Sequence, residues 1–133
     1  MFGGTKKLAT EIFQSVGLVT WLKTEQAMDI VTAISGSGPA YFFLLIQSLE
    51  EAAIELGLSH ATATQLSTQT ALGAARMAIE STESVEQLKR NVTSPGGTTE
   101  RALAVFETGR FPELVKKAVK SAAERAKELA AQF

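Results

Sequence analysis

The stretch from Pro39 to Leu56 constrains the fold most, because its apolar residues cover nearly the whole circumference of the helix that it predicts. Proline is favoured at the start of a helix and glycine just past its end, so Pro39 and Gly57 mark the bounds. A helix that is apolar on all sides is buried on more than one side. In a chain of 133 residues, we expect a second copy of the chain to supply the missing cover.

Helical patterning extends over most of the remaining sequence. Apolar residues recur three and four positions apart, and serine or glycine stands at the ends of the repeats. The other expected helices are 5–16, 26–34, 60–80, 84–91, 98–107 and 111–132. The sequence therefore predicts an all-α fold without internal repeats.

One short segment, Leu18–Leu22, has the composition of a strand instead. A single strand cannot form a sheet, so the segment indicates a connection to something larger. We therefore expect residues 1–22 to be a helix–strand remnant of a truncated α/β domain, and residues 23–133 to form the helical domain. Trp21 is expected to pack beneath the missing sheet.

Composition excludes several classes of protein. A formal net charge of −1 gives no reason to expect nucleic acid or an anionic membrane as a partner. The absence of cysteine excludes disulfides and cysteine-ligated zinc, and it is typical of a reducing cytoplasm. A single histidine, His60, cannot build a metal site alone, so no metal is expected. We also identify no run of about 20 apolar residues, the length that spans a membrane.

Two glycine-rich segments open predicted helices. The first contains Ser35, Gly36, Ser37 and Gly38; the second contains Ser94, Pro95, Gly96, Gly97, Thr98 and Thr99. The first amides of a helix have no partner within it, and they lie at the positive end of its dipole. Together the two segments could hold a small anion such as a carboxylate.

Each segment also has a purely structural interpretation. The first can be a tight turn between helices, capped by Ser35 or Ser37. It is not a dinucleotide fingerprint, because Tyr41 occupies the third glycine position. The second has more glycine than a plain loop requires, which favours binding. Glu25 and Asp29 lie four residues apart and could act as an acid/base pair, but we interpret them as a solvated first turn.

Four motifs together resemble the C-terminal half of pyrroline-5-carboxylate reductase, and the resemblance covers essentially the whole chain. They are Ile34-Ser-Gly-Ser-Gly-Pro-Ala-Tyr41, Leu72-Gly-Ala-Ala75, Val92-Thr-Ser-Pro-Gly-Gly-Thr-Thr99, and Ala104-Val-Phe-Glu107 followed by Gly109-Arg-Phe111. Their spacing also resembles that of the family. This resemblance is what gives the chain a candidate function.

The resemblance implies an oxidoreductase of the last step of proline biosynthesis. Family members reduce 1-pyrroline-5-carboxylate to L-proline with NADPH or NADH, which an N-terminal Rossmann domain binds. Their helical C-terminal domains interlock as homodimers, which in many members join into a decamer. By this resemblance the chain contains no cofactor-binding residue, and we expect it to dimerise but to be inactive alone.

For the site, the resemblance implies that Ser94, Gly96, Gly97, Thr98 and Thr99 bind the substrate carboxylate. The segment 35–38 is expected to shape the opposite wall. Leu44 stands where some members carry a hydroxyl residue, so no catalytic proton donor is assigned. Two other interpretations stay open: a non-catalytic helical oligomerisation module, and a helical adaptor that binds other proteins.

Overall fold

The computed structural model describes residues 3–132, and all regular structure within this range is helical. The elements are α1 (Gly3–Gln14), α2 (Ala27–Val31), the π-helical turn η1 (Thr32–Gly36), α3 (Gly38–Glu55), α4 (His60–Glu80), α5 (Val85–Asn91), α6 (Thr98–Thr108) and α7 (Phe111–Ala130). The predicted all-α fold is confirmed, and helix bounds differ from the expected ones by a few residues.

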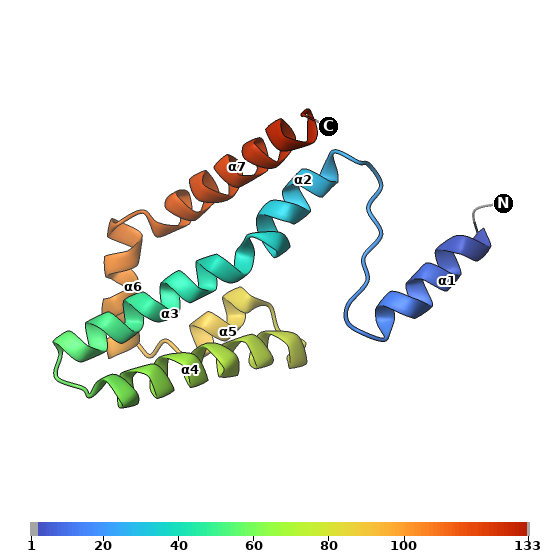
Figure 1. The fold of residues 1–133 in the computed structure, drawn as a ribbon. Helices are drawn as coiled ribbons and strands as arrows, with labels where there is room; N and C mark the ends of the chain where they lie inside the picture. The colour runs from blue at the N-terminus through green and yellow to red at the C-terminus, as the bar shows by residue number, and fades with distance from the viewer. Residues whose placement is uncertain (1–2, 133) are drawn as a thin grey trace.

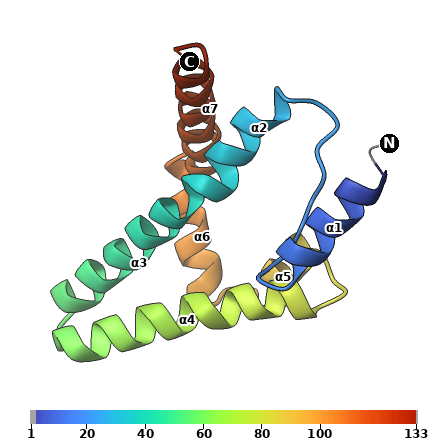
Figure 2. The ribbon, with the colours of Figure 1, turned by 45° about the vertical axis from the view of Figure 1, so that its right-hand side comes forward.

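The helices form an open frame (Figures 1 and 2). Helix α4 turns back along α3, and α5 packs on α4. Helix α7 returns along α2 and η1, and α6 contacts α7. Helix α1 contacts none of the other described helices and stands apart at the end of an irregular linker.

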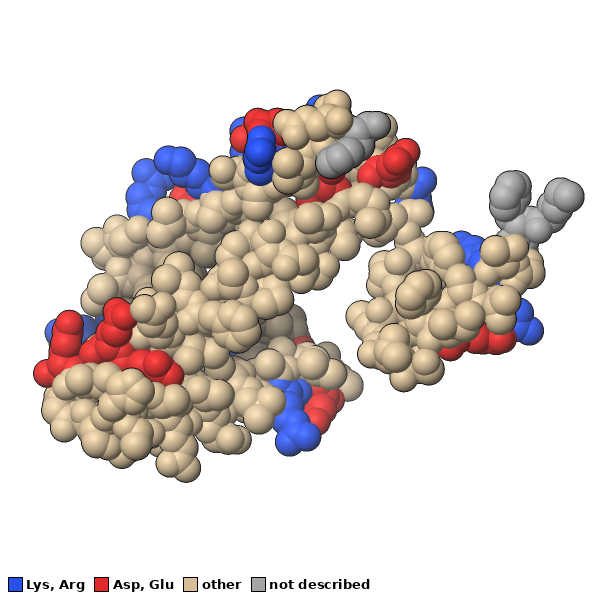
Figure 3. Space-filling view, in the orientation of Figure 1, with Lys and Arg blue, Asp and Glu red and all other residues tan. Residues whose placement is uncertain are grey.

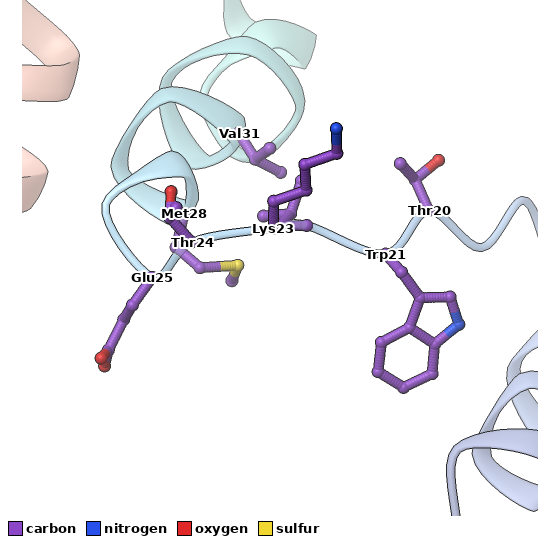
Figure 4. Close-up of a pocket in the computed structure, with 8 residues that line it drawn as sticks. Thr20, Trp21, Lys23, Thr24, Glu25, Met28 and Val31 are labelled. Atoms are coloured by element: carbon purple, nitrogen blue, oxygen red, sulfur yellow. The ribbon is translucent and has the colours of Figure 1, made fainter. Parts of the chain in front are cut away.

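The linker replaces the expected strand at residues 18–22, which has no regular secondary structure. A strand exists only by pairing with a neighbour, and no other extended segment of the described chain lies beside it. The expected packing of Trp21 beneath a sheet stays a prediction, because the described residues contain no sheet; here the side chain contacts α1 instead. Its Nε1–H donates to Oγ1 of Thr10 on α1 over 2.9 Å, and Nζ of Lys6 lies 4.8 Å from the ring centre. Figure 4 shows the linker running extended past this side chain.

The expected turn at residues 35–38 is instead a continuation of the helix. The amide of Ser37 donates to the carbonyl oxygen of Thr32 over 2.8 Å, a π-type bond, and Ser37 makes no side-chain cap. Proline has no amide hydrogen and crowds the carbonyl four residues earlier. A widened turn before Pro39 accommodates that conflict without ending the helix.

Helices α2, η1 and α3 consequently form one run, Ala27–Glu55, of 29 residues. By length and composition this run could cross a membrane. In the single chain only 11% of its most apolar 18-residue stretch is buried. No such run was expected, because the helix predicted to end at Ile34 instead continues into α3. Core helices of soluble proteins satisfy the same criterion.

The predicted helix ends are confirmed where the capping residue is local. Ser59 and Ser84 accept hydrogen bonds from the amides of Thr62 and Gln87, so each caps its helix. After α3, Gly57 adopts a φ of 103°. The amide of Leu58 then reaches the Ala53 carbonyl, which completes a glycine C-terminal cap.

The described chain has almost no core of its own. The buried apolar residues are Ala33 and Ala63, and no large side chain is fully buried. Phe42 and Phe43 on α3 are 67% and 69% exposed. Figure 3 shows a broad surface without charged side chains across the middle of the molecule. Soluble proteins rarely leave so much apolar surface uncovered, so another surface must cover this face.

Candidate functional site

The glycine bend, residues 94–99, leads directly into α6. Gly96 has a φ of 71°, a conformation that side chains disfavour. Gly97 occupies the cap position of α6, and its amide donates to the Ser94 carbonyl over 3.0 Å. A Cβ atom on Gly97 would lie 3.0 Å from that same carbonyl oxygen. Both glycines are therefore required by the shape of the bend.

The amides of the bend are not all available to a ligand. Gly96 donates to Oε2 of Glu100 over 2.8 Å, and the Gly97 amide is used by Ser94. Gly97 has no side chain that could cap α6. The amides of Thr98 and Thr99 lie in the first turn of α6, where they have no partner within the helix. They are at the positive end of the helix dipole and remain available to a ligand.

Sequence reasoning missed the role of Glu100. The signal was present, because a glutamate three residues after a helix cap commonly reaches back to an upstream amide. Here the reach extends one residue further, to Gly96, since the Gly97 amide is already bonded within the bend.

The bend is accessible. Ser94, Gly96 and Thr98 are exposed, while Gly97 and Thr99 are half-buried. The bend is thus not closed against a core. A small anion can approach the first turn of α6 from solvent.

The other predicted segment lies elsewhere in the chain. Ser35 and Gly36 are exposed, Ser37 is half-buried and Gly38 is buried at the start of α3. No Cα atom of α6 lies within 8 Å of a Cα atom of η1 or α3, although side chains of α3 and α6 border a common groove. Within one chain, the residues expected to form the two walls of a site therefore do not meet.

Two hollows of the described surface lie away from the glycine bend. One of about 550 Å³ is formed by the linker and α2, with Trp21, Met28 and Val31 among its lining residues (Figure 4). The second, of about 400 Å³, is an apolar groove of α3, α6 and α7 that includes Leu45 and Phe106.

The other residues considered in the sequence do not gather into a catalytic or metal-binding cluster within the described chain. Glu25 and His60 are exposed, Asp29 is half-buried, and Leu44 is 64% exposed on α3. Within residues 3–132, no three histidine, aspartate or glutamate side chains gather where they could hold a metal ion.

Gly36 and Gly38 do not form the turn of a dinucleotide site. Such a site needs a glycine-rich turn between a strand and a helix. Gly36 and Gly38 instead follow the helix α2 and lie in or beside the π-helical turn.

Comparison with known proteins identifies the relatives of this arrangement. The family pattern described as pyrroline-5-carboxylate reductase dimerisation matches residues 25–129. A pyrroline-5-carboxylate reductase of Pseudomonas aeruginosa is 50% identical over 125 residues, which are 94% of this chain and 46% of that protein. One from Haemophilus influenzae is 38% identical, over 96% of this chain and 48% of its own length. The chain thus spans about half the length of these curated relatives.

Solved structures agree with the sequence comparison. A pyrroline-5-carboxylate reductase of Coxiella burnetii superposes with a TM-score of 0.92 at 53% identity, over 96% of this chain and 47% of that chain. A Plasmodium falciparum pyrroline carboxylate reductase with NADP bound gives a TM-score of 0.85 at 41% identity, over 95% of this chain and 48% of its own.

Proposed function

This chain belongs to the pyrroline-5-carboxylate reductase family through its dimerisation domain, and from this membership we propose that it binds the substrate of such a reductase. The proposed reaction is the reduction of 1-pyrroline-5-carboxylate to L-proline by NADPH or NADH. We place most of the cofactor site outside this chain, because residues 3–132 show no glycine-rich turn between a strand and a helix.

One observation supports the binding role most directly. The Thr98 and Thr99 amides open α6 behind a cap residue without a side chain, in an accessible bend that two glycines shape. A helix N-terminus of this kind favours a carboxylate by hydrogen bonds and by the helix dipole. The hydroxyls of the two threonines add further donors.

The contribution of these residues to the reaction is orientation. Holding the ring by its carboxylate restricts how the C=N bond can be presented to the cofactor. The cofactor, when bound, supplies hydride to the imine carbon, and the imine nitrogen keeps its proton as the amine. Orientation alone can lower a barrier by about 7–11 kcal/mol in ideal cases. A protonated imine is already electrophilic, so the chain needs no dedicated acid.

We also propose that the chain acts as a homodimer. The exposed apolar face of α3 supports this, because a second copy would cover it. A second copy would also cover the apolar residues of the 29-residue run Ala27–Glu55, so their exposure in the single chain is explained by a protein interface without a bilayer. Association of dimers into a decamer stays a prediction, as does a cytoplasmic location, which suits a chain without cysteine.

The experiment that tests the binding role is a titration of the isotope-labelled chain with L-proline, followed by NMR. We expect the amide signals of Thr98 and Thr99 to move and saturate. Pyrrolidine, which has the same ring without the carboxylate, should leave them in place. The Ala61 and Thr62 amides, at the start of α4 behind the Ser59 cap, provide an internal control. Equal changes at both helices, or none at α6, would contradict the proposal.

A second candidate function is a helical oligomerisation module without a ligand. The small core of the single chain favours it, because the chain is built to be covered by a partner. The same titration separates the two. A pure oligomerisation module forms stable dimers but shows no saturable change at Thr98 and Thr99.

A further inference from the structure

The Glu100 side chain extends from α6 back to the glycine bend, residues 94–99. Its Oε2 accepts the Gly96 amide hydrogen over 2.8 Å, and this bond spans four residues from the first turn of α6 to the bend before it. Gly96 is the residue with a φ of 71°. The carboxylate therefore holds the one residue of the bend whose backbone conformation is least fixed by sterics.

This bond restrains the backbone conformation of the bend. The Gly97 amide donates to the Ser94 carbonyl over 3.0 Å. The Glu100 carboxylate accepts the amide of the preceding peptide, between Pro95 and Gly96. Together the two bonds remove both glycine amides from competition for a ligand and leave the Thr98 and Thr99 amides outward.

We propose that Glu100 is a positioning residue, which holds the bend in its binding shape before an anion arrives. The inference rests on the proposed carboxylate site and adds a residue to it. Flexible glycine pairs lose much entropy when a ligand orders them, and preorganisation avoids that cost. A carboxylate beside an anion site is otherwise unfavourable, because like charges repel.

The sign of the mutational effect separates positioning from simple charge. If Glu100 acts only as a nearby negative charge, removing it must tighten the binding of a carboxylate. If it holds the bend, removing it must weaken that binding. Glu113 offers a matched control, because it occupies the corresponding first turn of α7 and lies outside the bend.

The experiment measures the dissociation constant of L-proline from the Thr99 amide shift in the 133-residue chain and its variants. We expect Glu100→Ala to weaken binding roughly three- to tenfold, the factor that follows from one hydrogen bond of ordinary net strength. Glu100→Asp, which keeps the charge but loses reach, should weaken it similarly. Glu100→Gln keeps the length and an acceptor oxygen, so it should bind at least as tightly as the unchanged chain.

The Gly96 amide signal provides a second readout, because loss of its acceptor should move it upfield in Glu100→Ala and not in Glu113→Ala. Unchanged or tighter binding by both Glu100→Ala and Glu100→Asp overturns the positioning role while leaving the carboxylate site intact. If the unchanged chain shows no saturable shift with L-proline, the proposed function itself fails, and the role of Glu100 with it. Circular dichroism confirms that each variant keeps its helices.

Discussion

The Tyr41 hydroxyl donates a hydrogen bond to the carbonyl oxygen of Ala33, with 3.0 Å between the two oxygens. The bond spans eight residues, from the first turns of α3 back over η1. Ala33 is fully buried, so its carbonyl is far from bulk water. The tyrosine therefore supplies a partner to a backbone group that the widened helical turn leaves in an irregular environment.

Removing this hydroxyl should destabilise the π-helical turn. We expect Tyr41→Phe to lower the free energy of unfolding by about 1–2 kcal/mol, because a buried carbonyl loses its partner. Urea denaturation at a fixed protomer concentration measures the change. Ser48→Ala removes a hydroxyl that bonds the Leu44 carbonyl on the exposed side of α3, and it should change stability by less than about 0.5 kcal/mol. Equal effects of the two variants would contradict the role of Tyr41.

The junction between α6 and α7 contains a strained residue. Arg110 has a φ of 54°, which is unfavourable for a residue with a side chain. We expect Arg110→Gly to raise stability by about 0.5–1 kcal/mol as that strain is released. Arg101→Gly, within α6, should lower it by about 1 kcal/mol, since glycine weakens a helix interior. Thermal unfolding of both variants checks the opposite signs, and destabilisation by Arg110→Gly would show that its side chain has another role.

The exposed face of α3 should control oligomeric state. Phe43→Glu places a charge on that apolar face, so we expect the dimer to dissociate at micromolar protein, as measured by sedimentation equilibrium. Gln14→Glu adds the same charge on α1, which contacts no other helix, and should leave assembly unchanged. A chain that is already a clean monomer before mutation would refute the proposed dimer.

The shape of the bend should control ligand binding. Gly97→Val introduces a Cβ close to the Ser94 carbonyl, so we expect weaker binding of L-proline. Gly17→Ala is the control, because its added Cβ meets no atom within 4 Å. Titration by NMR compares the two, and wild-type affinity in Gly97→Val would count against the bend as the binding element. Circular dichroism separates a local change from loss of the fold.

Local signals in the sequence predicted the helices well. Ser59 and Gly57 cap helices in the structure as expected, because each acts within a few residues of its own position. Ser84, expected as the first residue of its helix, is the cap instead. The surroundings of Pro39 were predicted wrongly. Its position after two glycines indicated a break, but η1 carries the helix through with a widened turn, and α7 and Tyr41 pack on that turn.

For the candidate site too, some features were predictable from the sequence and others were not. The glycines of the bend were evident from their excess over what a loop needs, and the roles of residues 94–99 and 35–38 stay predictions. The engagement of the Gly96 amide by Glu100 was not identified, although its spacing was visible. The separation of α6 from η1 could not be read from the sequence, because it depends on how α7 folds back.

The sequence by itself determined where helices begin and end, which face of the chain is apolar, and to which family the motifs point. Those properties follow from local chemistry and from side-chain periodicity. The tertiary structure alone decided that residues 18–22 form no strand, that Gly36 and Gly38 belong to a continuing helix, and that so little of the apolar surface is buried. The reason is physical: pairing, helix continuity and burial depend on what lies alongside a segment, and adjacent residues do not specify it.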